Sequence, residues 1–219
     1  MVRDIIRNLQ KDIRVELRSP FALNVSSAFA VIITVSISLA SGGIPFTITV
    51  QSILLWTIIV FAAMNGLSHI FVRETEQGTA LFLRVSTGAD SIFLSKLIYN
   101  QVFMALIITI VTPLFLFFLG MSPRHIGHFI AVLFAGGTAI ASTTTIVAAM
   151  VAKAGGRGSL FTILSFPLML PILRVAIIST AAALDRSTPS AGGAVFLLAF
   201  SGFISVISFL LFRFIWSDE

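Results

Sequence analysis

The sequence has no cysteine and few charged residues for its length. Its 219 residues include no cysteine, and Asp, Glu, Lys and Arg together make up only 11% of them. The lack of cysteine excludes a disulfide framework and any thiolate chemistry on this chain. A typical soluble domain is about 25% charged, so this chain is not expected to have a large water-facing surface. Hydrophobic residues instead make up 57% of it, and the mean hydropathy is +1.05.

Long apolar runs occupy most of the chain. A bilayer core about 30 Å thick requires roughly 20 mostly apolar residues in a helix. Because the runs leave no room for a separate soluble domain, we expect an all-α polytopic membrane protein in which residues 1–219 form a single transmembrane domain. The six predicted spans are residues 22–40, 47–71, 97–119, 127–151, 160–183 and 193–214.

The basic residues predict how these spans are oriented. Lys and Arg concentrate in cytoplasmic loops. All but three of the 14 Lys and Arg lie in the N-terminal segment, in the loops after the second and fourth spans, or at the C-terminal end. The exceptions are Arg124 and Arg186, on the opposite side, and Arg174, within the fifth span. Both termini are therefore expected to be cytoplasmic.

Residues 1–18 have the pattern of an amphipathic helix. Their apolar residues recur at spacings of three and four, with charges between them. This pattern predicts a helix in the membrane interface, with its basic side chains near anionic headgroups. A helix packed on another cytoplasmic protein is the alternative, and both descriptions can hold together. The apolar positions are Val2, Ile5, Ile6, Leu9, Ile13 and Leu17.

Few groups inside the spans could carry chemistry. All nine acidic residues lie outside the spans or at their ends, which disfavours an ion-coupled pump. Arg174 either extends to the headgroups or faces a cavity and contacts an anionic ligand group. Pro167 and Pro171 each remove a helical hydrogen bond. They therefore predict a kink in the fifth span, which serves either packing or a hinge.

His125 and His128 follow the third span at a spacing that can place two imidazoles on one helical face, as a metal or haem site requires. No carboxylate or third histidine stands near them, so interfacial histidines are the favoured interpretation. No catalytic, cofactor-binding or metal-binding residue is predicted on this chain, and the motifs G-x-S-x-G and H-E-x-x-H are absent.

The segment 73–96 is unusual because it carries six charged residues between apolar spans. Its first residues are expected to continue the second span until Gly78 breaks the helix. Leu81, Phe82 and Val85 then form an apolar edge, and Asp90 or Ser91 is expected to cap the next helix. Such a cytoplasmic elbow with exposed apolar side chains indicates a surface for another protein. A solvated connector is the alternative.

The elbow has the form E-x-E-x-G-T followed by apolar residues. Together with six spans and an interfacial N-terminal helix, it resembles the permease half of ABC-2-type transporters. Four further stretches resemble the B subunit of the cytochrome c maturation (Ccm) system, the CcmB family of haem exporter permeases. They are LSKLIYN at 94–100, STTTIVAAMVAKAG at 142–155, SLFTILSFPLMLPIL at 159–173 and LLFRFIW at 210–216. The resemblance covers nearly the whole chain.

The resemblance implies a non-catalytic subunit of the bacterial inner membrane that pairs with a second copy and with CcmA-like ATPase subunits. It also implies three further partners, which are CcmC-like and CcmD-like membrane subunits and a periplasmic haem chaperone. Nucleic acid is not expected as a partner. The chain has no G-x-x-x-x-G-K-[ST] phosphate loop, so ATP is expected on the partner subunit. By the resemblance, the ATPase would dock on Arg73, Glu74, Glu76, Gly78, Leu81, Phe82 and Arg84.

The resemblance implies that the complex exports haem. An alternative within the family is that ATP hydrolysis drives the release of the haem-loaded chaperone. No pair of axial ligands stands at membrane depth, so haem ligation by this chain is not expected. Pro167, Pro171 and Arg174 are the candidates for a hinge or a ligand path. The alternatives are an ABC-2 permease for lipid, polysaccharide or drug, a secondary transporter, and a membrane enzyme.

Overall fold

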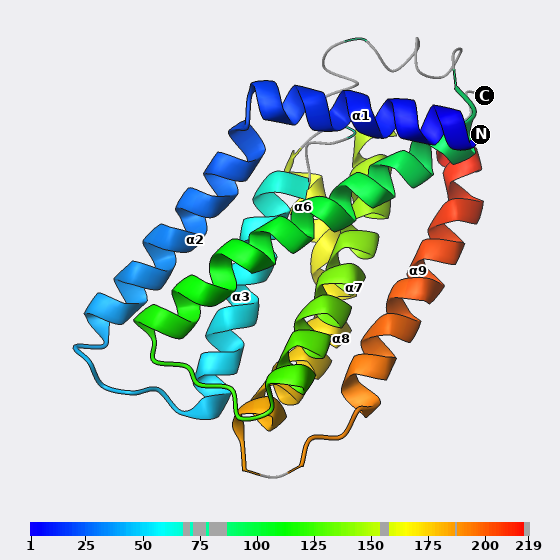
Figure 1. The fold of residues 1–219 in the computed structure, drawn as a ribbon. Helices are drawn as coiled ribbons and strands as arrows, with labels where there is room; N and C mark the ends of the chain where they lie inside the picture. Colours follow the sequence, from blue (N-terminus) through cyan, green and yellow to red (C-terminus); the bar gives the residue numbers. More distant parts are fainter. Residues whose placement is uncertain (68–70, 72–77, 79–86, 154–157, 187, 217–219) are drawn as a thin grey trace.

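The computed structural model describes residues 1–67, 71, 78, 87–153, 158–186 and 188–216, and these residues form helices joined by short connections (Figure 1). One short helix precedes six long ones, with the helix labels taken from Figure 1. The helices are α1 Val2–Arg18, α2 Phe21–Ala40, α3 Ile48–Leu67, α6 Ala89–Phe118, α7 Ile126–Lys153, α8 Gly158–Leu184 and α9 Gly192–Trp216.

The helices α2, α3 and α6 to α9 are each long and apolar enough to cross a membrane. The shortest have 20 residues, which corresponds to about 30 Å of helix, the thickness of a bilayer core. The predicted all-α fold with six spans is therefore confirmed. The helix α6 begins at Ala89, ahead of the third predicted span at residue 97 and within two residues of the predicted cap at Asp90 or Ser91.

The helix α1 lies across one end of the bundle, which we call the α1 end (Figure 1). The chain turns from α1 into α2 at Ser19 and Pro20, because the residue before a proline is disfavoured in a helix. The half-buried Ile5, Leu9 and Ile13 recur at spacings of four, and α1 packs on α6. Other apolar side chains of α1, including Val2, Ile6 and Leu17, are exposed. The apolar positions of α1 are thus divided between the bundle and its surroundings.

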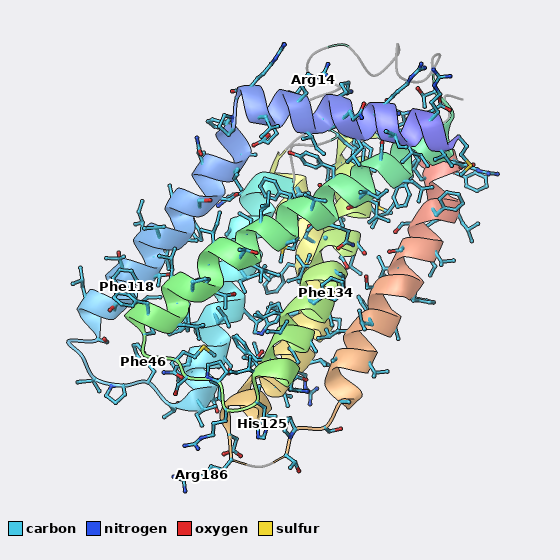
Figure 2. The ribbon with its side chains drawn as sticks, in the orientation of Figure 1. Arg14, Phe46, Phe118, His125, Phe134 and Arg186 are labelled. Carbon is cyan, nitrogen blue, oxygen red and sulfur yellow. The ribbon has the colours of Figure 1, made fainter. Side chains whose placement is uncertain are left out.

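The charged side chains mark the two ends of the bundle. Arg14 lies on α1, whereas His125 and Arg186 lie at the opposite end (Figure 2). The start of α6 and the end of α9 lie at the α1 end (Figure 1). The segments that were predicted to share the cytoplasmic side and that the structure describes therefore meet at one end of the molecule.

The helix α7 is the central element of the bundle. Of its most apolar stretch, 78% is buried, far more than in any other described span. Small residues allow neighbouring helices to approach its backbone closely. The clearest case is Gly136, because a methyl group there would overlap the ring of Trp56. The small residues of α7 thus serve packing.

Several hydroxyl groups inside the bundle take part in hydrogen bonds within the chain. Thr143, Thr144 and Thr145 of α7 each donate a hydrogen bond to the backbone carbonyl four residues earlier. The indole N–H of Trp56 donates to the hydroxyl of Thr180 at 2.8 Å, which ties α3 to α8. Such internal pairing is required where no water is available to polar groups.

Candidate functional site at the α1 end of the bundle

The predicted docking residues lie in segment 73–96, of which the structure describes Gly78 and residues 87–96. Gly78 is exposed and has a φ of 66°, a left-handed conformation that glycine adopts without strain. This conformation agrees with the predicted break of the helix at this position. The remaining predicted docking residues lie outside the described residues: Arg73, Glu74, Glu76, Leu81, Phe82 and Arg84.

An aromatic cluster packs the residue range just before this segment and the last part of the segment against the end of α9. Phe71, before the segment, has its ring centroid 5.7 Å from that of Phe212 and 6.1 Å from that of Trp216. Phe93, within the start of α6, lies 5.2 Å from Phe212 and 6.3 Å from Phe209. Aromatic rings at these separations attract one another beyond the effect of their burial. Phe71 and Phe93, near the two ends of the segment, therefore share one packed base at the end of α9.

A charged pair at the surface reinforces this base. The carboxylate of Asp90 in the first turn of α6 accepts two hydrogen bonds from the guanidinium of Arg213, at 2.8 and 2.6 Å. The expected cap by Asp90 or Ser91 is wrong, because the N-cap residue is Gly88 and no side chain caps it. The carboxylate of Asp90 instead makes a bidentate pair, in which both partners are charged. The hydroxyl of Ser91 points to the carbonyl oxygen of Met1, 3.5 Å away.

A second charged pair is buried and joins α6 to α1. The ammonium of Lys96 lies 3.0 Å from the carboxylate of Asp12, and the two side chains are 1% and 9% exposed. Lys11 also approaches Asp12, at 3.6 Å. Buried charges are tolerated only when they are paired, so this contact fixes where α1 sits on the bundle. The sequence predicted Lys96 on the cytoplasmic side but did not reveal its partner.

A network of polar side chains links α6, α7 and α9 within the membrane-spanning part. Gln101 donates from its amide nitrogen to the hydroxyl of Ser142 at 3.1 Å and to the carbonyl of Thr138 at 3.3 Å. The hydroxyl of Ser142 also lies 3.0 Å from those of Ser201 and Ser205. Nearby, Asn100 donates to Thr145 at 2.8 Å. Sequence reasoning missed this network, although two adjacent amides inside a predicted span were a signal for it.

The candidates for a hinge or ligand path share the exposed side of α8. Pro167, Pro171 and Arg174 are all exposed, and their spacing of four and three residues places them on one face of the helix. The helix α8 continues through both prolines. Within the described part of the chain, Arg174 has no ion pair or hydrogen bond. The three residues therefore face the surroundings of the chain.

The two histidines lie where the connection between α6 and α7 meets the end of α8. The backbone N–H of His125 donates to the carbonyl of Ala183 at 3.0 Å. Both imidazoles are partly buried, and Nε2 of His128 is enclosed. Among the residues that the structure describes, no group of three or more His, Asp or Glu side chains could hold a metal ion.

The fold defines a multi-pass helical membrane protein whose charged and aromatic contacts gather at one end. A comparison with protein families matches residues 3–216 to the family described as CcmB protein, and the chain belongs to this family. Its members are ABC transporter permease subunits in haem transport and cytochrome c biogenesis. A search of curated proteins finds no match.

Proposed function

We propose that this chain couples ATP hydrolysis on a partner subunit to haem export, or to the release of a haem-loaded chaperone, in cytochrome c maturation. The observation that carries the proposal is the shared base under segment 73–96. Phe71 and Phe93 pack on the end of α9, while Asp90 and Lys96 bind α9 and α1. A force applied to the segment would therefore move α1, α6 and α9 together.

In this proposal the α1 end faces the cytoplasm of the bacterial inner membrane. The five basic residues of the N-terminal segment lie on this side, together with Lys153 and Arg213 at the ends of α7 and α9. This distribution follows the rule that Lys and Arg favour the cytoplasmic side. The exposed apolar side chains of α1 would then enter the interface, with its basic side chains near anionic headgroups.

ATP would bind and be hydrolysed on a CcmA-like subunit. The glycine-rich stretch 155–158 of this chain has no lysine to contact a phosphate. The ATPase would dock on segment 73–96, where Leu81 and Phe82 offer apolar contacts, and Glu74 and Glu76 offer charge. Like other ABC permeases, the chain would act with a second copy of itself.

Haem would pass through the complex as cargo, without ligation by this chain. Its transfer would involve CcmC-like and CcmD-like membrane subunits and a periplasmic haem chaperone. The support for this part of the proposal is membership of the CcmB family, whose permeases serve haem transport.

The test is purification of the tagged full-length chain from native membranes in mild detergent. We expect an ATPase subunit to co-purify in stoichiometric amount, and the complex to show haem absorbance when the chaperone is present. An assembly without a nucleotide-hydrolysing subunit would contradict the coupling. An assembly with an ATPase whose activity responds to lipid or polysaccharide instead of haem-loaded chaperone would identify a permease for another cargo.

A further inference from the structure

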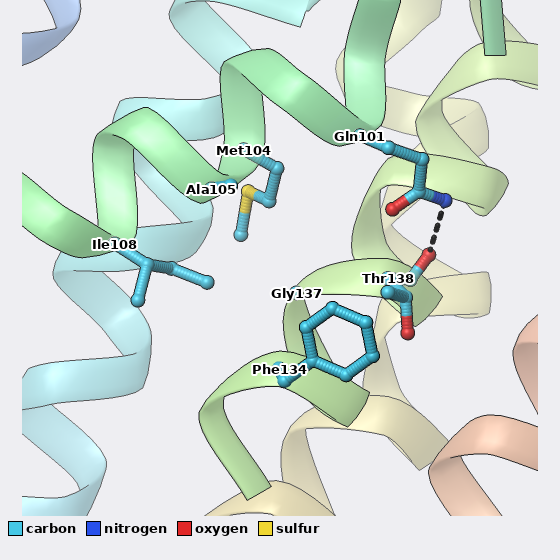
Figure 3. Close-up of a pocket in the computed structure, with 7 residues that line it drawn as sticks. All are labelled: Gln101, Met104, Ala105, Ile108, Phe134, Gly137 and Thr138. Carbon is cyan, nitrogen blue, oxygen red and sulfur yellow. Dashed lines mark hydrogen bonds between the residues drawn. The ribbon is translucent and has the colours of Figure 1, made fainter. Parts of the chain in front are cut away.

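A hollow of about 190 Å³ opens between α6 and α7, away from the aromatic cluster and the charged pairs. Its apolar lining comes from Met104, Ile108 and Phe134, with Ala105 of α6 and Gly137 of α7 beside them (Figure 3). The end of the Ile108 side chain covers Gly137, so the exposed Ala105 is the small residue over which another transmembrane helix can approach closely. For comparison, an apolar cavity of about 150 Å³ in a protein core binds benzene, so the hollow has room for one large apolar side chain.

Gln101 forms the polar end of the hollow, and its amide nitrogen and its carbonyl oxygen differ in their hydrogen bonding. Its nitrogen donates to Thr138 and Ser142. Its carbonyl oxygen accepts no hydrogen bond within the described part of the chain, and it is turned toward the space between Met104 and Phe134 (Figure 3). The hollow therefore presents one hydrogen-bond acceptor in an otherwise apolar lining.

The depth of this acceptor limits what can satisfy it. Thr138 is 12 residues from the start of α7 at Ile126 and 15 from its end at Lys153, which corresponds to about 18 Å and 22 Å along the helix. At that depth neither bulk water nor lipid headgroups are available. A lipid acyl chain could fill the hollow but has no donor, and an unpaired carbonyl is strongly disfavoured in hydrocarbon.

We propose that the hollow receives a transmembrane helix of a different polypeptide. This helix inserts one large apolar side chain between Met104 and Phe134, and it donates a hydrogen bond from a polar side chain to the carbonyl oxygen of Gln101. Close packing over small residues and an interhelical hydrogen bond are the two interactions that drive helix association in a bilayer. Both are prepared on this surface, and neither depends on where an ATPase binds.

A second copy of this chain would not close as a dimer if it used its exposed intramembrane cation as the donor. That cation is Arg174, which lies on the exposed face of α8. In Figure 1, α6 lies in front of α7, whereas α8 lies behind it. A copy that placed Arg174 in the hollow of its neighbour would repeat head to tail and would not close as a dimer.

The test is photocrosslinking in native membranes, with p-benzoylphenylalanine in place of Phe134 in the full-length chain. Phe203 of α9 is a matched control, because the two phenylalanines are 65% and 62% exposed and both belong to membrane-spanning helices. We expect the probe at Phe134 to form one adduct, which mass spectrometry maps to an apolar segment of another polypeptide. That segment should contain a hydrogen-bond donor within one or two turns of the adduct.

Two variants identify the hollow as the docking site. Gln101→Met removes the acceptor at nearly constant shape, and Ala105→Phe fills the hollow while leaving the hydrogen bonds of Gln101 intact. Each should lower the adduct yield about threefold or more, the effect of losing one interhelical contact, while the yield at Phe203 stays unchanged. Because Ala105 is exposed, its replacement should not disturb folding. The Ala105→Phe variant therefore tests the docking site even if Gln101→Met does not accumulate in the membrane. Adducts with lipid only, adducts between two copies of this chain, or yields unaffected by both variants would overturn the proposal.

Discussion

The guanidinium of Arg213, in the last turn of α9, binds the carboxylate of Asp90, in the first turn of α6, through two hydrogen bonds of 2.8 and 2.6 Å. The two parallel hydrogen bonds of a guanidinium and a carboxylate restrict their relative orientation. The contact therefore sets the angle as well as the distance between the two helix ends. It does so within segment 73–96, which we propose as the docking segment for an ATPase.

Loss of this pair should weaken transport more than folding. Arg213→Lys keeps the charge but cannot form both hydrogen bonds. We expect it to lower cytochrome c assembly severalfold at nearly unchanged membrane abundance, because the pair is largely exposed and the aromatic cluster still packs. The exchange of Asp90→Arg with Arg213→Asp should restore part of the activity. Asp4→Asn is the control, because Asp4 is a partly exposed carboxylate of α1 that pairs with the N-terminal ammonium and not with α9. Full activity of Arg213→Lys would show that the pair has no role in coupling.

The buried pair of Lys96 and Asp12 should matter for folding itself. Lys96→Met leaves the Asp12 carboxylate buried without its nearest cation, and removing one partner of a buried pair costs roughly 3–5 kcal/mol in soluble proteins. We expect a large fall in the melting temperature of the detergent-solubilised chain, measured by fluorescence-detected size-exclusion chromatography after heating. The double variant Asp12→Leu with Lys96→Met should recover much of the loss. Lys11→Met, which removes the more distant cation at 3.6 Å, should have a smaller effect. Equal melting temperatures for all variants would exclude the pair as a structural contact.

The spans could be predicted from the sequence because their signal is one-dimensional. An apolar run of sufficient length must be a helix in a bilayer, and the basic residues between the runs predict which ends share a side. The partners of the charged residues carry no such signal. Asp12 and Lys96 are separated by 84 residues, and Asp90 and Arg213 by 123. The predicted cap by Asp90 failed for this reason, because a local rule competed with a stronger partner far along the chain.

The aromatic cluster could not be predicted from the sequence, because phenylalanine is so common in this chain. The chain has 21 phenylalanines, most of them in the predicted spans, and hydropathy does not distinguish the ones that meet. Only the packing of α6 and α9 selects Phe71, Phe93 and Phe212 to meet. The network around Gln101 and Ser142 was missed for a similar reason, since small polar residues in a span predict close packing but not which helices they join.

Close packing on α7 can be tested with two glycines of the same helix. Gly136→Ala would place a methyl group in the ring of Trp56, whereas Gly127→Ala would meet nothing within 4 Å. We expect Gly136→Ala to lower the melting temperature and to reduce the folded yield severalfold. The reason is that Trp56 is fully buried and hydrogen-bonded to Thr180, so its ring cannot move aside easily. Gly127→Ala should be neutral or slightly stabilising, since alanine favours the helix by up to about 1 kcal/mol. Similar behaviour of the two variants would contradict the packing described for α7.

Charge reversal in segment 73–96 tests the proposed docking surface. Glu74→Lys combined with Glu76→Lys should reduce co-purification of the ATPase subunit severalfold, because both carboxylates belong to the proposed contact. The abundance of the chain in the membrane should be unchanged, since neither residue lies within a described span. Asp4→Lys, a reversal at the same end of the bundle but outside the segment, is the control. Normal recovery of the ATPase with the double variant would place its docking surface elsewhere.

Replacement of the exposed prolines of α8 distinguishes a hinge from packing. Pro167→Ala and Pro171→Ala each restore a backbone N–H to the helix and remove a residue that is about 3 kcal/mol less favourable than alanine in a helix interior. Because both prolines are exposed, the replacements open no cavity in the core, and membrane abundance should not fall. If the bend that each proline permits is used during transport, cytochrome c assembly should decrease several-fold at normal abundance. Leu168→Ala, a partly exposed neighbour at 37%, controls for the loss of side-chain volume on the same turn. A parallel loss of abundance and activity would instead assign the prolines to packing against a neighbouring subunit.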